Sequence, residues 1–136
     1  MKIVVIDGQG GRIGKLVIEK INELCVNHEL IAIGTNSLAT AAMIKAGAKK
    51  AATGENPVVV NARNADIIIG PIGIIMANSL LGEVTEKMSV AIADSDAYKI
   101  LIPVSKCHHK VVGLKDLTID EYVELVYNEV KAILVG

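Results

Sequence analysis

Aromatic side chains are almost absent from this sequence. Of its 136 residues only three are tyrosine, and phenylalanine and tryptophan do not occur, although 51% of the residues are hydrophobic. The core must therefore consist of Ile, Val, Leu and Ala, a composition typical of buried parallel strands covered by helices. The lack of rings for base stacking, a net charge of -1 and the absence of a basic cluster argue against a nucleic-acid partner.

Cysteine and long apolar runs are also scarce. Cys25 and Cys107 are the only cysteines, and neither has a partner at the spacing of a metal or redox motif. Adjacent His108 and His109 would point to opposite sides of an extended chain, so we expect no metal site. The most apolar stretch, 66–82, is broken by Gly and Pro and is too short for a bilayer, and no signal peptide is evident. These features predict a soluble, cytoplasmic protein without a membrane partner.

Strand-like and helix-like segments alternate along the chain. We expect strands over 2–6, 29–34, 66–70 and 99–104, with edge strands at 49–54 and 110–114. Helices are expected over 11–26, 37–48, 55–65, 71–81, 85–97 and 119–134. With short links and no change of composition, this alternation predicts an α/β fold, with one three-layer domain spanning residues 1–136 and a mainly parallel sheet.

Polar residues mark several of the expected helix starts. Ser37 and Thr85 are N-cap candidates, and Asn56 precedes Pro57 as a cap precedes the first helical position. The stretch 118–121, Thr-Ile-Asp-Glu, has the spacing of a capping box before the last helix.

A cluster of glycines follows the first strand. Gly8, Gly11 and Gly14 are spaced G-x-x-G-x-x-G, with Gly10 added, between a strand and a helix, which is the context of a dinucleotide-binding turn. Glycine accepts a positive φ and lets a phosphate approach the backbone. We expect Gly11 to serve ligand approach, so that its substitution leaves the fold nearly intact, and Gly14 to let the helix pack on the strand.

The expected anion contacts come mainly from backbone N–H groups of residues 10–13, helped by the helix dipole. Arg12 would add a smaller contribution as an exposed cation. The preceding Asp7 would repel a phosphate, so we expect it to point away and hydrogen-bond the loop. This part of the predicted site comprises Gly8, Gln9, Gly10, Gly11, Arg12 and Ile13. The alternative is a glycine turn needed only for strand–helix packing.

Three further loops, at 34–37, 70–73 and 105–109, should reach the same edge of a parallel sheet. The end of the second strand carries Thr35 and Asn36, where NAD-binding proteins have an acid, so NADP or a smaller phosphorylated ligand is favoured over NAD. Ordinary turn and cap chemistry is the alternative for these two residues. Gly70 and Pro71, in the sequence GPIG, could form a wall under a flat ring.

Two resemblances extend this interpretation. Gly8 to Gly14 resemble the G-x-x-G-R-M-G turn of reductases such as dihydrodipicolinate reductase, over about seven residues. "VIDGQGGRIGK", "IAIGTNSLATAAMIKAGA", "TGENPVVVNARNADIIIGPIGI", "SLLGEVT" and "KILIPVSKC" together resemble an uncharacterised family of short bacterial proteins over nearly the full length. That resemblance implies a Rossmann-like single domain and no catalytic residue. Arg12 departs from that family's Gly-Gly-Gly-Ile-Gly pattern.

The sequence therefore predicts a module that binds a nucleotide or another phosphorylated ligand at the glycine turn and the adjacent sheet edge. The cofactor is unknown, with NADP or another nucleotide as candidates, and the catalytic residues are unknown. A small NAD(P)-dependent reductase and a non-catalytic assembly protein are the alternatives. Segment 71–81 is apolar almost all round, and helix 119–134 has apolar residues outside its main stripe. We therefore also expect a homodimer, or a complex with another protein, through one of these helices. The alternative is that helix 71–81 is wholly covered by its neighbours within one chain.

Overall fold

Five parallel strands form the centre of the computed structural model, which describes residues 1–104 and 109–136. The strands are β1 (Lys2–Asp7), β2 (Glu29–Gly34), β3 (Lys50–Thr53), β4 (Ile67–Pro71) and β5 (Tyr98–Ile102). Their order in the sheet is β3-β2-β1-β4-β5, and every neighbouring pair is parallel. The expected α/β fold with a parallel sheet is confirmed.

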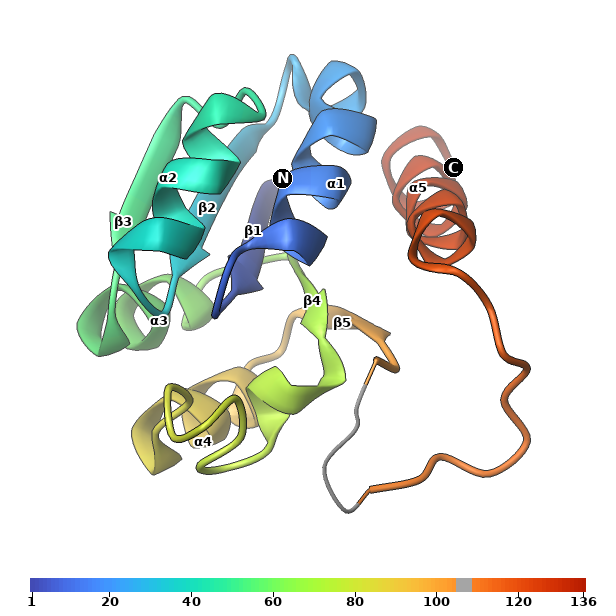
Figure 1. Cartoon of the computed structure of the whole chain (residues 1–136). Coiled ribbons are helices and arrows are strands. Elements are labelled where there is room, and N and C mark those ends of the chain that lie inside the picture. The colour runs from blue at the N-terminus through green and yellow to red at the C-terminus, as the bar shows by residue number, and fades with distance from the viewer. Residues whose placement is uncertain (105–108) are drawn as a thin grey trace.

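Helices cover both faces of this sheet (Figure 1). The α-helices are α1 (Arg12–Ile21), α2 (Ser37–Lys45), α3 (Glu55–Ala62), α4 (Glu86–Asp94) and α5 (Ile119–Val135). Two short 3-10 helices, η1 (Asn22–Cys25) and η2 (Ile72–Ile75), follow α1 and β4. α1, α2 and α5 contribute to one core cluster, whereas α3, α4 and η2 contribute to the other.

The alternation of side chains along β1 explains these two cores. Ile3 and Val5 belong to the cluster under α1 and α5, while Val4 and Ile6 belong to the cluster under α3 and α4. All four side chains are fully buried, because successive residues of a strand point to opposite faces and helices cover both. The result is the expected three-layer arrangement.

β1 is the central strand, and the order in which strands are added to the sheet changes sides there. From β1 the chain builds β2 and β3 on one side, and then returns to build β4 and β5 on the other. The loops after β1 and β4 therefore leave the sheet side by side at its carboxyl edge, a position where α/β proteins bind ligands. Asp7 and Gly34 pair at the carboxyl ends of β1 and β2, next to the glycine turn.

The expected helix over 71–81 is wrong. Pro71 still belongs to β4, only Ile72–Ile75 form a 3-10 turn, and the backbone is already extended at Met76. Beyond it, Leu80 and Leu81 have φ values of 54° and 56°, which an α-helix does not contain. A segment that is apolar on all sides has no helical period, so its composition does not specify the backbone conformation.

Several boundaries also differ from expectation. The first helix ends at Ile21 and tightens into η1, and residues 110–114 contain no strand. Asn36, not Ser37, caps α2 by accepting from the Ala39 N–H. Gly54 is the N-cap residue of α3, so that Asn56 and Pro57 are its second and third residues. Polar cap candidates lie next to one another here, and sequence spacing does not separate them.

Two helix starts and the last helix agree with the prediction. Thr85 caps α4, with its hydroxyl accepting from the Met88 N–H. Thr118 and Glu121 form the reciprocal capping box of α5, at 3.2 Å and 3.0 Å. The interpretations of Cys107 and His108 lie outside the described residues.

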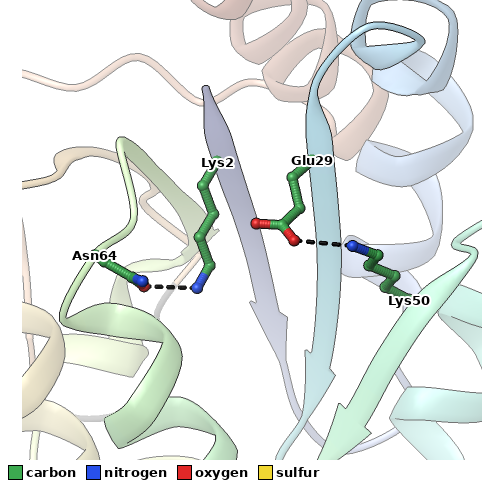
Figure 2. A network of polar contacts seen from close by, with 4 residues as sticks. All are labelled: Lys2, Glu29, Lys50 and Asn64. Carbon is green, nitrogen blue, oxygen red and sulfur yellow. Dashed lines mark hydrogen bonds and ion pairs between the residues drawn. The ribbon is translucent and has the colours of Figure 1, made fainter.

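The amino edge of the sheet carries ordinary surface contacts (Figure 2). Lys50 pairs with Glu29 at 2.9 Å between the starts of β3 and β2, and Lys2 Nζ donates to Asn64 Oδ1 at 2.6 Å. The hydrogen bond from Lys50 lowers the pKa of Glu29. Such exposed pairs contribute little to stability.

None of the helices in the described ranges is both long and apolar enough to cross a membrane.

Candidate functional site

The glycine turn joins the end of β1 to the start of α1. Gly11 is the N-cap residue of α1 with φ +73°, and its N–H donates to the Gly8 carbonyl oxygen at 2.9 Å. Gln9 also has a positive φ, 49°. The turn is therefore tight, and it directs the amino end of α1 toward the carboxyl edge of the sheet.

The Asp7 carboxylate accepts hydrogen bonds from the backbone of this turn. It is 4% exposed, and its two carboxylate oxygens accept from the N–H groups of Gly8 at 2.8 Å and Gly14 at 2.7 Å. Burial raises the pKa of Asp7 above its usual value, and the nearby Glu83 carboxylate adds to that effect, while the N–H bonds from Gly14, Gly8 and Ile13 oppose it. Asp7 thus points into the turn and bonds the loop, as expected.

Two glycines are required by packing. A Cβ on Gly11 would lie 2.7 Å from the Ala39 Cα of α2, and a Cβ on Gly14 would lie 2.9 Å from the Asp7 Cβ. The Gly14 contact agrees with the predicted role in helix–strand packing. The expectation that Gly11 can be replaced with the fold nearly intact is wrong, because this residue has a left-handed backbone and meets the α2 backbone.

Backbone donors remain at the outer side of the turn. Within the described part of the chain, the N–H groups of Gly10 and Arg12 have no hydrogen-bond partner. A Cβ added at Gly10 would meet nothing within 4 Å, so the space beside this residue is open. The Arg12 side chain is exposed and makes no hydrogen bond or ion pair with another described residue. The outer side of the turn therefore offers two free N–H donors, the Arg12 cation and open space beside Gly10.

A carboxylate from another loop lies on the inner side of the turn. Glu83, in the segment between η2 and α4, accepts through its Oε1 from three donors. These are the Gln9 N–H at 2.9 Å, the Thr35 hydroxyl at 2.6 Å and the Asn36 side-chain amide at 2.7 Å. Partial burial raises the pKa of Glu83, but the three hydrogen bonds outweigh it and lower the pKa below its usual value. Glu83 is therefore held as a carboxylate.

Asn36 links the two loops further. Its Oδ1 accepts from the Ala39 N–H as the cap of α2, while its Nδ2 donates to the Gln9 carbonyl oxygen at 3.0 Å as well as to Glu83. The cap interpretation of Asn36 is thereby confirmed, and the same side chain also touches the glycine turn. The end of β2 and the turn after β1 form one connected polar cluster.

Gly70 and Pro71 lie in the last part of β4 and are both buried. A Cβ on Gly70 would collide with the carbonyl oxygen of Ile6, so this glycine allows β4 and β1 to lie close together. The glycine turn, Thr35 and Asn36 therefore come together around Glu83, whereas Gly70 and Pro71 are buried residues of β4 and make no hydrogen bond to Glu83.

Glu83 was missed by the sequence analysis. It is 74 residues from Gln9 and 48 from Thr35, so no local spacing relates them. The one usable signal is that its loop follows β4, whose carboxyl end shares an edge with β1. No group of three or more His, Cys, Asp or Glu side chains suited to a metal ion occurs in the ranges 1–104 and 109–136.

The parallel sheet in this order, with a glycine turn between β1 and α1, defines a Rossmann-like α/β protein. Within that class, residues 2–135 match the family model of a domain of unknown function, DUF3842, and the chain belongs to this family. No curated protein and no solved structure matches the chain. The family carries no assigned activity, so any function must be argued from the site itself.

Proposed function

We propose that this protein is a binding module for a nucleotide or another small phosphorylated ligand, held at the glycine turn and the carboxyl edge of the sheet. The observation that carries the proposal is the pair of free N–H groups at Gly10 and Arg12 beside open space. The amino end of a helix with unsatisfied N–H groups attracts anions, because the donors and the helix dipole act in the same direction.

The neighbouring loop fits a ligand that extends beyond its phosphate. Thr35 and Asn36 at the end of β2 are partly exposed and lie next to Gln9 of the turn. In this fold the end of the second strand is where a ribose or its 2′-phosphate lies. Hydroxyl and amide groups suit either, so NADP or a mononucleotide is the ligand class that we favour.

A nucleotide panel tests this proposal. AMP, ADP, NAD, NADP and pyrophosphate are added to the purified protein, and the melting temperature is measured. A ligand present at 100 times its Kd stabilises the fold by about 2.7 kcal/mol, which gives a clear shift. Arg12→Ala should reduce that shift modestly, whereas Arg63→Ala, an exposed arginine on α3's carboxyl end, should leave it unchanged. No shift with any of these compounds would refute the proposal.

A second candidate function has its own observation. The N–H groups of Gly8, Gln9 and Gly14 already donate to Asp7 or Glu83, and Gly11 and Gly14 serve packing. These contacts favour an assembly protein whose turn is purely structural. A small NAD(P)-dependent reductase is less favoured, because the residues that the structure describes around Glu83 and the glycine turn include no arranged proton donor and acceptor for a substrate. The nucleotide panel separates the first two, since only a binding module is stabilised by a ligand.

Cellular location and assembly are part of the same proposal. The scattered cysteines fit a cytoplasmic, reducing environment. With the 71–81 helix gone, the proposed homodimer contact moves to α5, where Leu125 is 51% and Val135 is 73% exposed. Apolar side chains exposed on one helix favour a contact with a second copy.

A further inference from the structure

Glu83 occupies donors that an anionic ligand could use. Its Oε1 lies within 2.9 Å of three donors that come from the turn after β1 and from the end of β2. We propose that the Gln9 N–H, the Thr35 hydroxyl and the Asn36 amide form an oxyanion subsite, which Glu83 fills in the free protein and leaves when a phosphate or carboxylate of the ligand binds. This inference rests on the proposed function.

The chemistry of the subsite suits an oxyanion. An N–H, an O–H and an amide NH₂ converge on one oxygen atom, and a carboxylate and a phosphate accept such bonds in the same way. The carboxylate also lies directly over the turn, since a Cβ on Gly8 would be 2.9 Å from Glu83 Oε1. An anion bound at the Gly10 and Arg12 N–H groups would share this short turn with the Glu83 charge, which is bonded to the neighbouring Gln9 N–H. The two negative groups disfavour each other, so ligand binding and Glu83 binding compete.

The backbone of the loop that carries Glu83, residues 78–84, is closed by a hydrogen bond and contains residues in an unfavourable conformation. Asn78 and Val84 close the loop, with the Asn78 N–H donating to the Val84 carbonyl oxygen at 2.7 Å. Inside it, Asn78, Leu80 and Leu81 have φ values of 67°, 54° and 56°. Leucine rarely adopts this left-handed backbone, and such residues persist only where surrounding contacts hold them. Departure of Glu83 removes three of those contacts and lets the loop relax.

Tertiary contacts fix both ends of the Glu83 loop, at Ser79 and at Val84. Val84 is 1% exposed in the core under α4, and the Ser79 hydroxyl donates to the Gly73 carbonyl oxygen. By contrast, Leu81 at the tip is 94% exposed. Movement can therefore be confined to residues 80–83, without disturbing α4 or β4. If only a fraction of the molecules has Glu83 displaced and can bind the ligand, the apparent Kd equals the intrinsic Kd divided by that fraction.

The test compares pyrophosphate binding to the wild type, Glu83→Ala and Glu86→Gln by calorimetric titration. Glu86 is exposed at the start of α4 and outside the subsite, so its variant controls for the loss of one nearby negative charge. If the open form is about a tenth of the wild-type molecules, Glu83→Ala binds pyrophosphate about tenfold more tightly. The Glu86→Gln variant should match the wild type. Succinate, titrated in parallel, distinguishes a carboxylate ligand from a phosphate ligand.

A second measurement uses the wild type alone, in case Glu83→Ala folds poorly. Hydrogen exchange of the backbone amides in residues 80–83 should become faster when pyrophosphate binds. If the wild type binds pyrophosphate but Glu83→Ala binds equally or more weakly, and exchange in the loop does not increase, the inference is overturned and the proposed function stands. If neither protein binds pyrophosphate, succinate or a nucleotide, both the proposed function and the inference are overturned.

Discussion

The Glu83 carboxylate and the Thr35 hydroxyl lie 2.6 Å apart, although 48 residues separate them in the sequence. This hydrogen bond connects the loop after β4 to the end of β2, across the glycine turn that follows β1. It brings a fixed negative charge to the part of the fold where an anionic ligand would lie. Asp7, Glu83 and the free donors of the turn therefore lie in one small region of the protein.

Replacing Asp7 should destabilise the fold. In Asp7→Asn, an amide NH₂ replaces one of the two oxygens that accept from Gly8 and Gly14, so a buried N–H loses its partner. A buried unsatisfied donor costs about 1–3 kcal/mol. Chemical denaturation of the two proteins measures the difference. Asp66→Asn is the control, because Asp66 accepts from the Lys2 N–H at 2.7 Å in an exposed position. Equal losses in both variants would refute the buried role of Asp7.

Gly11 and Gly10 should respond differently to alanine. Gly11→Ala puts a side chain on a backbone with φ +73° against the Ala39 Cα, which should cost about 1–3 kcal/mol of unfolding free energy. Gly10→Ala adds a methyl group to open space and should leave the melting temperature nearly unchanged. Thermal unfolding without ligand compares the two. A stable Gly11→Ala protein would restore the interpretation that this glycine serves only ligand approach.

Acid should reduce the contribution of the Glu83 carboxylate to the free energy of unfolding. The pKa of Glu83 is lower in the folded protein than its usual 4.5, so the stability that it contributes is fully present above the unfolded pKa. That stability is lost as the pH falls through the lowered folded pKa. Asp7 has the opposite sign: its raised pKa contributes stability below 3.8, which is lost as the pH rises through its folded pKa.

The Glu83→Gln variant separates these two titrations. Its unfolding free energy, compared with that of the wild type, should fall less on acidification below pH 4.5, because only the wild type carries the Glu83 carboxylate. Denaturant titrations at a series of pH values supply the comparison. Parallel pH profiles for the two proteins would show that the three hydrogen bonds to Glu83 do not favour its charged form.

The fold could be predicted largely from the sequence, because the strands and α5 have clear apolar patterns. β1 is a short β-branched run, and Val123, Val126 and Val130 mark one face of α5. The segment 71–81 could not be predicted in the same way. Its side chains are apolar in every direction, and leucine itself does not favour the positive φ values found at Leu80 and Leu81.

The candidate site was predicted only in part. The turn, its Asp7 contact and the packing role of Gly14 follow from residues close together in the sequence. The role of Gly11 does not, because the neighbour that excludes its side chain is Ala39 on α2. Glu83 was missed for the same reason, since tertiary contacts between distant loops leave no local pattern.

The assembly state is open to direct measurement. Sedimentation velocity at micromolar concentration should detect a homodimer, and Leu125→Lys should weaken it, because Leu125 is 51% exposed on α5. Leu38→Lys is the control, as Leu38 is 67% exposed on α2. A monomer at all concentrations, with no effect of either variant, would refute the dimer.

Pyrophosphate titration into the wild type, Gly10→Ala and Gly10→Asp tests whether the glycine turn binds an anion. A Cβ at Gly10 meets nothing within 4 Å, so both variants should keep the fold, and they differ only by the carboxylate that Asp places beside the free donors. We predict that Gly10→Ala binds pyrophosphate like the wild type, and that Gly10→Asp binds about tenfold more weakly or worse, a difference of about 1.4 kcal/mol. Equal binding by all three proteins, or binding by none of them, would contradict the assignment of an anion site to this turn.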